Sequence, residues 1–316
     1  MIIIYINMKL LKHDDCFMKI KSTEIDDTFA EAFKMFGSRI IITAETKEWA
    51  TAAAQSVTGF ATSVIGCKCE AGIETEILPE NSPDQRHGVS VLFFAMDSES
   101  LGKRLVERIG QSVMTCPSTS CFNGIDDGNE VGVGGQLRYF GDGHQISKKI
   151  LNKRLWRIPV MDGEFLVDDI FRVKEAVGGG NILIMAKDQN TALKAAKSAV
   201  KAMREVQNII LPFPNGVVRS GSKVGSKYKA LIASTNDAYC PTLSSVVEKT
   251  EIGEGVNCVL EIVIDGLGLE DVEQAMRVGA EAAIKPGVKK ISAGNYGGGL
   301  GQYKIHLHKL LAKGEK

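Results

Sequence analysis

The stretch NCVLEIVIDGLGLEDVEQAMRVGAEAAIKPGVKKIS, residues 257–292, decides the fold. Residues 257–264 are mostly apolar and rich in β-branched side chains, which is typical of a buried strand. Residues 269–284 place apolar side chains at helical spacing, and Pro286-Gly287 ends that helix. Residues 288–292 return as a second strand. The stretch therefore predicts a strand, a helix and a strand that pack as one unit.

Three more copies of this pattern precede it. The first places strands at 39–43 and 60–66 around a helix at 46–58. The second places a strand at 88–95 and a helix capped by Asp97 or Ser98, and its return strand begins with residues 111–115. The third places strands at 181–186 and 209–211 around a helix at 191–206. Two units in each half predict an α+β fold with two ferredoxin-like (split βαβ) lobes. A single doubly wound sheet would need a nucleotide-binding turn, which we do not find.

The chain divides into three parts on this interpretation. Residues 1–24 form an amino-terminal extension that we expect to be peripheral, and Met18 is an alternative start. Residues 25–161 form the first ferredoxin-like lobe with a connecting segment. Residues 162–316 form the second ferredoxin-like lobe, which carries Glu261.

The composition argues against several classes of function. Lys and Arg together number 38, as do Asp and Glu, so no global field favours nucleic acid or an anionic membrane. The 7 cysteines are scattered without a pair of CxxC motifs, which favours reduced thiols and a cytoplasmic location. The apolar start of the chain is too short to span a bilayer. His306 and His308 alternate on an expected terminal strand, but with no third ligand nearby we predict no metal site.

Glu261 interrupts the apolar strand of residues 257–264. Burying an ionised carboxylate without a partner is costly, so the usual result is a raised pKa and a neutral acid. A neutral acid can donate a hydrogen bond or a proton to an oxygen that becomes charged during a reaction. Alternatively, Glu261 pairs with an Arg or Lys, or points to solvent from an edge strand. The alternation of a strand puts it on one face with Val259, Val263 and Asp265 and leaves both possibilities open.

The segment GVVRSGSK, residues 216–223, resembles a phosphate-binding loop, but its lysine comes one place late, so we reject an ATPase. Ser220, Ser222 and Lys223 remain in a polar, basic loop. Such a loop suits the carboxylates or phosphates of a bulky ligand, and it is equally typical of a solvated surface.

Two further segments are notable for their spacing. Residues 294–301, GNYGGGLG, contain five glycines and allow backbone to lie against a substrate ring or another subunit. Thr28 and Glu31 have the spacing of a capping box, which predicts the start of a short helix.

Six segments together resemble one known family. They are DTFAEAF (27–33), TGFATSVI (58–65), EAGIE (70–74), PFPNG (212–216), STNDAYCP (234–241) and KISAGNYGG (290–298). In sequence and in order they are similar to formylmethanofuran:tetrahydromethanopterin formyltransferase, and the similarity runs from about residue 25 to residue 308.

This resemblance implies an acyltransferase of one-carbon metabolism, in methanogenesis or formaldehyde/CO2 interconversion. It moves a formyl group between methanofuran and N5 of tetrahydromethanopterin, which are co-substrates rather than prosthetic groups. The resemblance also implies two ferredoxin-like lobes, a cytoplasmic homotetramer built as a dimer of dimers, and no metal or prosthetic group. The catalytic acid of the family falls in the strand matched here by residues 259–264, which makes Glu261 the expected catalytic residue.

The polar members of the matching segments and of the basic loop are expected to bind substrate. These residues are Thr28, Glu31, Ser220, Ser222, Lys223, Asn236 and Asn295. Protonated Glu261 would stabilise the tetrahedral oxyanion.

The alternatives are one component of a formyltransferase/hydrolase complex and a catalytically silent paralogue with an assembly or regulatory role. Gly299 keeps the second open, because family members often have a basic residue there.

Overall fold

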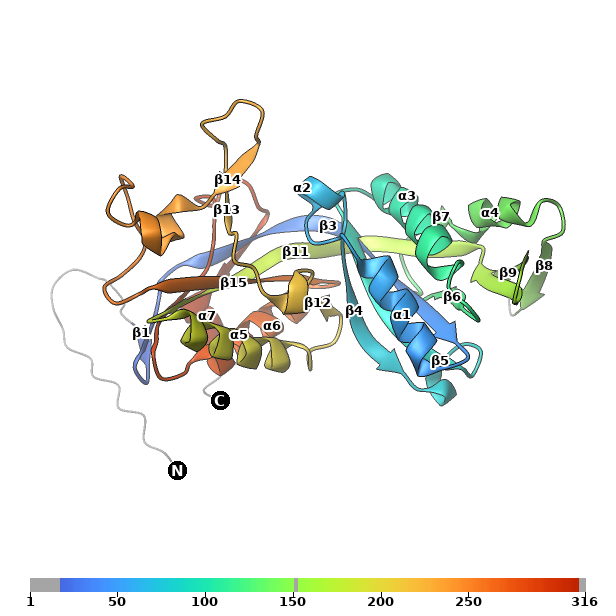
Figure 1. The fold of residues 1–316 in the computed structure, drawn as a ribbon, viewed down its shortest axis with the longest axis horizontal. Coiled ribbons are helices and arrows are strands. Elements are labelled where there is room, and N and C mark those ends of the chain that lie inside the picture. The colour runs from blue at the N-terminus through green and yellow to red at the C-terminus, as the bar shows by residue number, and fades with distance from the viewer. Residues whose placement is uncertain (1–17, 151–152, 313–316) are drawn as a thin grey trace.

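The computed structural model describes residues 18–150 and 153–312 (Figure 1). Its helices are α1 (Lys47–Thr58), α2 (Val64–Cys67), α3 (Ser98–Arg108), α4 (Gly134–Leu137), α5 (Gln189–Met203), α6 (Leu269–Ala283) and α7 (Leu307–Ala312). Its strands are β1 (Met18–Ile20), β2 (Thr23–Ile25), β3 (Phe29–Ala44), β4 (Glu70–Ile77), β5 (His87–Ala95), β6 (Ser120–Asn123), β7 (Asn129–Gly132), β8 (Ile146–Ile150), β9 (Lys153–Val160), β10 (Gly163–Asp168), β11 (Ile170–Ala186), β12 (Ile209–Ile210), β13 (Ser222–Val224), β14 (Ala233–Thr235), β15 (Cys258–Gly266), β16 (Val288–Ser292) and β17 (Tyr303–His306). The result is a mixed α+β fold.

The first lobe packs two helices against one face of four antiparallel strands. Its strands lie in the order β6, β3, β5, β4. Helix α1 presents a stripe of small residues to the sheet, and α3 presents Leu101 and Leu105, all fully buried. Because these side chains recur at helical spacing, each helix covers the sheet with one apolar face.

The second lobe repeats this arrangement with the strand order β16, β11, β15, β12. Helices α5 and α6 cover one face, where Leu260, Ile262 and Ile264 join their core. The two helices approach closely at Gly279, because a side chain there would collide with Met203. The opposite face of β15 is left free for other contacts.

Two long strands join the lobes into one sheet. In Figure 1, β3 and β11 run along the length of the molecule, and residues Phe33–Gly37 of β3 pair with Lys174–Gly178 of β11. Strand β11 bends where its register shifts between Val177 and Gly180, and Gly179 has the positive φ of +81° that this bend requires. The lobes therefore share backbone hydrogen bonds, not only side-chain contacts.

The return strands of the first lobe differ from the sequence prediction. The strand predicted at 60–66 does not form there, because residues 64–67 form α2; the return strand is β4, which begins at Glu70. The residue with left-handed backbone after α1 is Phe60 (φ 49°). Residues 111–115 continue from α3 as a wider helical turn, and the return strand β6 begins at Ser120. Backbone contacts with the sheet override the local pattern in both places.

Residues at the two ends of the described chain also differ from expectation. Thr28 and Glu31 do not begin a helix: β3 starts at Phe29 and pairs with β17. His306 ends β17 whereas His308 lies in α7, so the two histidines do not alternate on one strand.

The amino-terminal segment is predicted to be peripheral as far as residue 24. In the structure, β2 pairs with β16 and the buried Thr23 hydroxyl donates to Val288 O, so residues 23–24 belong to the second lobe. The part of that prediction on residues 1–17, including the choice of start, lies outside the described residues.

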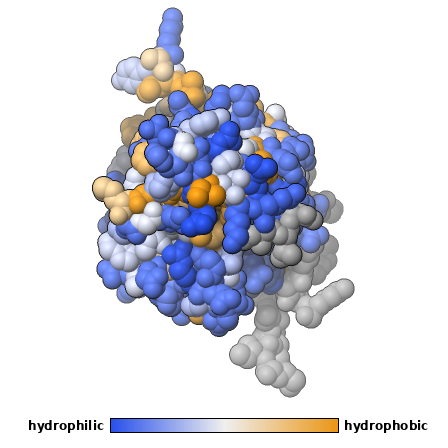
Figure 2. Space-filling view, turned by 90° about the vertical axis from the view of Figure 1, so that its right-hand side faces the viewer, coloured by the Kyte–Doolittle hydropathy of each residue, from blue (hydrophilic) through white to orange (hydrophobic). Residues whose placement is uncertain are grey.

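Figure 2 shows the end of the molecule formed by the first lobe. This face is largely hydrophilic, with small and separated apolar areas. The visible part of this face therefore offers no extended apolar surface to a ligand.

Candidate active site

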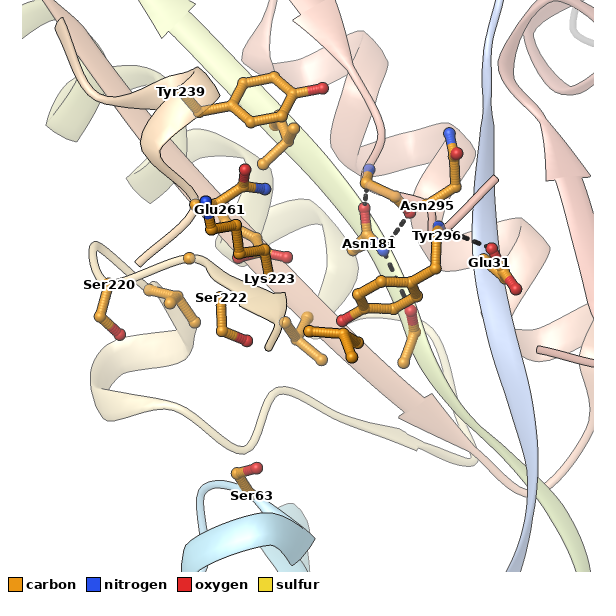
Figure 3. Close-up of a pocket in the computed structure, with 18 of the residues that line it drawn as sticks. Glu31, Ser63, Asn181, Ser220, Ser222, Lys223, Tyr239, Glu261, Asn295 and Tyr296 are labelled. Atoms are coloured by element: carbon orange, nitrogen blue, oxygen red, sulfur yellow. Dashed lines mark hydrogen bonds between the residues drawn. The ribbon is translucent and has the colours of Figure 1, made fainter. Parts of the chain in front are cut away.

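A cavity of about 890 Å³ opens where the free face of β15 meets the first lobe. The second lobe and the start of β3 supply most of its walls, and α2, Glu70 and Met96 supply the wall from the rest of the first lobe. All eight residues selected from the sequence line it: Thr28, Glu31, Ser220, Ser222, Lys223, Asn236, Glu261 and Asn295. Residues from opposite ends of the chain thus converge on one site (Figure 3).

Glu261 lies partly buried on the free face of β15, an orientation that the alternation of side chains had left open. Its strand is central, since β11 pairs with it at Leu183 and the backbone of Val218 pairs with Glu261 in both directions on the other side. Within residues 18–150 and 153–312, no Lys or Arg forms an ion pair with it. Burial alone raises the pKa of the Glu261 carboxyl to about 7. At neutral pH a large fraction of this carboxyl is a neutral acid facing the cavity.

The loop that carries Ser220 and Ser222 passes directly over this acid. A side chain on Gly221 would lie 3.5 Å from Glu261 Oε2, so the missing Cβ lets the loop approach closely. The Asn236 N–H donates to Gly221 O and holds the loop against the neighbouring segment. Lys223 Nζ lies 2.7 Å from Asp237 Oδ2, which neutralises the basic charge expected to face a ligand.

The glycine-rich segment after β16 forms the opposite wall. Asn295 Nδ2 donates to Thr28 Oγ1 (3.1 Å) and to Phe29 O (3.2 Å), which ties the segment to the start of β3. The Glu31 carboxylate accepts from four backbone N–H groups of this segment. Burial opposes its ionisation, but these N–H groups outweigh burial and hold the pKa of Glu31 below its usual value. Glu31 therefore serves the loop rather than facing the cavity as a free anion.

Asp265 shares the free face of β15 but lies deeper than Glu261. It is fully buried, and its Oδ1 accepts from the Gly179 N–H at 3.0 Å. Burial and the neighbouring Glu70 raise the pKa of the Asp265 carboxyl, and burial also raises the pKa of Glu70. Burial therefore favours the neutral form of both carboxyls, one from each lobe.

Sequence reasoning missed several residues of the cavity. Asn181 clamps the glycine-rich segment, since its Oδ1 accepts from Gly294 N at 2.6 Å and its Nδ2 donates to Gly294 O at 3.1 Å. Tyr239 and Tyr296 also line the cavity, and both stand inside segments that carried the resemblance. Ser63 was missed because its segment was interpreted as a strand rather than as the start of α2.

Two family models match the chain, one for each half. Residues 18–160 match the model described as formylmethanofuran-tetrahydromethanopterin formyltransferase, and residues 163–310 match the proximal lobe of the same enzyme. The chain belongs to this formyltransferase family. The protein is accordingly an acyltransferase with two lobes.

Relatives match over nearly the whole family length. The formylmethanofuran–tetrahydromethanopterin formyltransferase of Methylobacillus flagellatus is 56% identical over 93% of this chain and 100% of its own. The enzyme of the same name from Methanothermus fervidus is 49% identical with the same coverage. One component of the formyltransferase/hydrolase complex of Methylorubrum extorquens is 46% identical over 93% of this chain and 97% of its own.

Two solved structures of the family superpose closely. The formyltransferase from Methanosarcina barkeri has a TM-score of 0.88 at 47% identity, covering 93% of this chain and 100% of the other. A chain of the formyltransferase/hydrolase complex from Methylorubrum extorquens, solved with methylofuran, has a TM-score of 0.91 at 45% identity, covering 93% and 99%. Both the fold and the lobe arrangement therefore follow the family.

Two other observations concern the described ranges, 18–150 and 153–312. No helix there is both long and apolar enough to cross a membrane. No group of three or more His, Cys, Asp or Glu side chains there is arranged to hold a metal ion.

Proposed function

We propose that this protein transfers a formyl group between formylmethanofuran and N5 of tetrahydromethanopterin in the cavity above β15, with Glu261 as the acid. The observation that carries the proposal is a carboxyl without an ion-pair partner among the described residues, with a pKa of about 7, in the lining of a cavity of about 890 Å³. Family membership supplies the identity of those substrates.

The reaction needs no covalent bond to the enzyme. The N5 amine attacks the formamide carbon, a C–N bond forms, and the carbonyl oxygen becomes a tetrahedral oxyanion. Neutral Glu261 donates a hydrogen bond to this oxygen and stabilises it. The bond from carbon to the methanofuran nitrogen then breaks, and that nitrogen takes the proton lost by N5. Holding both substrates in one cavity supplies about 7–11 kcal/mol of the barrier reduction, by analogy with intramolecular reactions.

The polar residues that border the cavity form two groups, one on each side of it. We propose that Ser220, Ser222 and Asn236 contact substrate from the loop above Glu261. Thr28 and Asn295 contribute from the opposite wall, where they also bond to each other.

Lys223 contributes a charge that Asp237 already balances, so we propose that it orients an anionic substrate group only when that pair opens. This arrangement makes Lys223 a residue of substrate affinity rather than of chemistry.

Each lobe is proposed to be a ferredoxin-like unit, with the lobes divided as residues 25–161 and 162–316. The support is the strand order, because in both lobes the first strand lies between the fourth and the third, and all pairs are antiparallel.

We also propose a cytoplasmic homotetramer, a dimer of dimers, without a prosthetic group and without nucleic acid or membrane as partners. The β13–β14 hairpin supports self-association, because Val224, Tyr228 and Ile232 are exposed by 63%, 75% and 72%. Size-exclusion chromatography with light scattering tests the assembly, and a monomer at micromolar concentration would contradict it.

A second candidate is a component of a formyltransferase/hydrolase complex. The specific observation in its favour is the TM-score of 0.91 to a chain of such a complex. In that case the same transfer takes place beside a hydrolase partner.

The test is formyl transfer by the purified wild type beside Glu261→Gln, followed through formation of the N5-formyl product. We expect the variant to lose about a hundredfold or more in kcat, as when an oxyanion donor is removed elsewhere. The matched control is Glu254→Gln, an exposed carboxylate just before β15, which should keep full activity.

Each other outcome is informative. Full activity in Glu261→Gln would overturn the acid mechanism and leave the reaction in place. Activity that appears only when the protein is copurified with a partner would favour the complex. A folded wild type that is inactive in both settings would support a silent paralogue.

A further inference from the structure

The segment Tyr296–Gly301 is shaped by one carboxylate. Glu31 Oε2 accepts from the N–H groups of Tyr296 (2.7 Å) and Gly298 (2.9 Å), and Oε1 accepts from those of Leu300 (2.6 Å) and Gly301. The side chain of Glu31 is almost fully buried. A cradle of this kind needs left-handed backbone, which Gly297 and Gly298 supply with φ of +75° each. Glu31 thereby fixes the path of the chain where Tyr296 begins.

Tyr296 is held from both its backbone and its ring. Its ring packs beside Phe33 with the centroids 6.1 Å apart. The residue is still 41% exposed and lines the cavity. Figure 3 shows its ring extending from the glycine-rich segment toward the side of the cavity that carries Ser222 and Glu261.

The surroundings of the Tyr296 phenol keep it protonated. Burial first, and then the charges of Glu261 and Glu31, raise the pKa of the Tyr296 phenol, while the Ser222 hydroxyl lowers it. The phenol consequently keeps its proton at neutral pH and can only be a hydrogen-bond donor to an anion.

We infer that Tyr296 donates its phenolic hydrogen to the same oxyanion as Glu261, and that Glu31 is the positioning residue that holds Tyr296 in place. The inference rests on the proposed function. A phenol paired with a neutral carboxylic acid is a known form of oxyanion stabilisation in proteins. The Tyr296 proton stays on the phenol throughout, so it adds a hydrogen bond and no new proton transfer to the reaction.

The two donors stand on different elements, Glu261 on β15 and Tyr296 on the segment after β16. Their approach to each other depends on the Glu31 cradle, because the segment between Gly294 and Gly301 has no strand or helix of its own. Loss of the cradle should therefore move Tyr296 and leave Glu261 where it is. This difference makes the role of Glu31 separable from a general effect on folding.

The first experiment compares kcat and KM for formyl transfer in wild type, Tyr296→Phe and Glu31→Gln. Tyr296→Phe keeps the ring and its packing, and we expect kcat to fall about tenfold or more with little change in KM. The control is Tyr139→Phe, an exposed tyrosine of the first lobe outside the cavity, which should match the wild type.

The double variant decides the role of Glu31. In the Glu31→Gln background, Tyr296→Phe should cost less than about twofold, because the phenol is no longer in place. A purely structural role for Glu31 would instead leave the two effects multiplicative. Either that result, or a Tyr296→Phe enzyme within twofold of the wild type, would overturn the inference.

A second measurement does not depend on activity. The difference in tyrosinate absorbance between wild type and Tyr296→Phe, followed through an alkaline titration, reports the Tyr296 phenol alone. In Glu261→Gln its pKa should fall, because a nearby negative charge is gone. An unchanged pKa would show that the Tyr296 phenol and the Glu261 carboxyl do not interact. This result would refute the inference and leave the proposed function in place. A wild type without formyl transfer would instead overturn the proposed function, and with it the role of Tyr296.

Discussion

Ser90 and Glu261 hold the same position in the two lobes. Each is the fourth residue of the third strand of its lobe, β5 or β15. Each pairs with the residue three places before the end of the first strand, Ile41 for Ser90 and Leu183 for Glu261. Two lobes of equal topology thus place a polar side chain at one equivalent point.

What surrounds that point differs completely. The buried Ser90 hydroxyl donates to Glu74 Oε2 at 2.6 Å, and Glu74 forms a two-bond pair with Arg39 at 2.6 and 2.7 Å. Asn208 of the second lobe completes this network through its backbone N–H and its side chain. Glu261 has none of these partners. A satisfied network stabilises one lobe, and an unsatisfied acid gives the other its chemistry.

The difference originates in the connection that leads into the third strand. In the first lobe residues 78–86 connect β4 to β5, whereas in the second lobe residues 211–257 connect β12 to β15. The longer connection builds the β13–β14 hairpin and a wall of the cavity. The chemistry of the second lobe therefore depends on the connection that covers its sheet, and not on the sheet that both lobes have in common.

The largest expected effect breaks the satisfied network. Glu74→Gln leaves the Arg39 charge between the lobes without its partner, and we expect a loss of about 3 kcal/mol in the free energy of unfolding. Urea unfolding followed by circular dichroism measures it. Glu76→Gln is the matched control on the same strand, because its pair with Lys47 is exposed and should be worth under about 0.5 kcal/mol. Equal effects of the two substitutions would contradict the comparison.

The next largest effect is an increase in stability, expected when Glu261 is replaced. The folded pKa of Glu261, about 7, exceeds its ordinary value of 4.5, so the folded state binds more protons and stability falls as pH rises through this window. Glu261→Gln should therefore be more stable than the wild type at pH 8, on the order of 2 kcal/mol, and equal to it at pH 4. Thermal unfolding at both pH values checks this. A variant that is less stable at pH 8 would indicate that the carboxylate is satisfied after all.

The pH dependence of the reaction sharpens the same point. If protonated Glu261 is the acid, kcat/KM should fall above pH 7, approaching tenfold per pH unit. Rates measured from pH 6 to pH 9 in wild type and Glu261→Gln test it, because the variant should lack this decline. A wild-type rate that rises steadily over the range would exclude a neutral acid with this pKa.

The smallest expected effect is that of Ser90→Ala. It removes one hydrogen bond to Glu74, and we expect a loss of about 1 kcal/mol in stability with kcat within twofold of the wild type. Denaturant unfolding and the formyl-transfer assay together measure the two quantities. A larger loss of activity than of stability would show that the first lobe also takes part in the chemistry.

The sequence predicts best where a pattern is local. The strand Val288–Ser292 has its predicted bounds, and α6 agrees to within one residue, because helical spacing and Pro286-Gly287 are contained in one short stretch. Alternation along the strand also groups Glu261 with Val259, Val263 and Asp265, but it does not tell which face the helices cover.

The remainder depends on contacts between distant residues. Glu31 accepts hydrogen bonds from the glycine-rich segment, which lies more than 260 positions further along the chain. Its local capping-box spacing cannot show these contacts and suggests a helix that does not form. The clamp of Asn181 on Gly294 spans more than 100 positions. In α2 the Ser63 cap and the bond from Val64 N–H to Glu70 Oε1 hold the helix, and no periodicity in residues 60–66 reports them.

The long strand β3 has a consequence for how the protein is made. Its first residues, Phe29–Ala32, pair with β17 near the other end of the described chain, whereas Lys34–Gly37 pair with β11. When the ribosome has completed β11, it has not yet translated β17, which pairs with the start of β3. Until Tyr303–His306 emerges, this edge of the nascent sheet stays open to other chains. One of the earliest strands to be synthesised is thus one of the last to be completed.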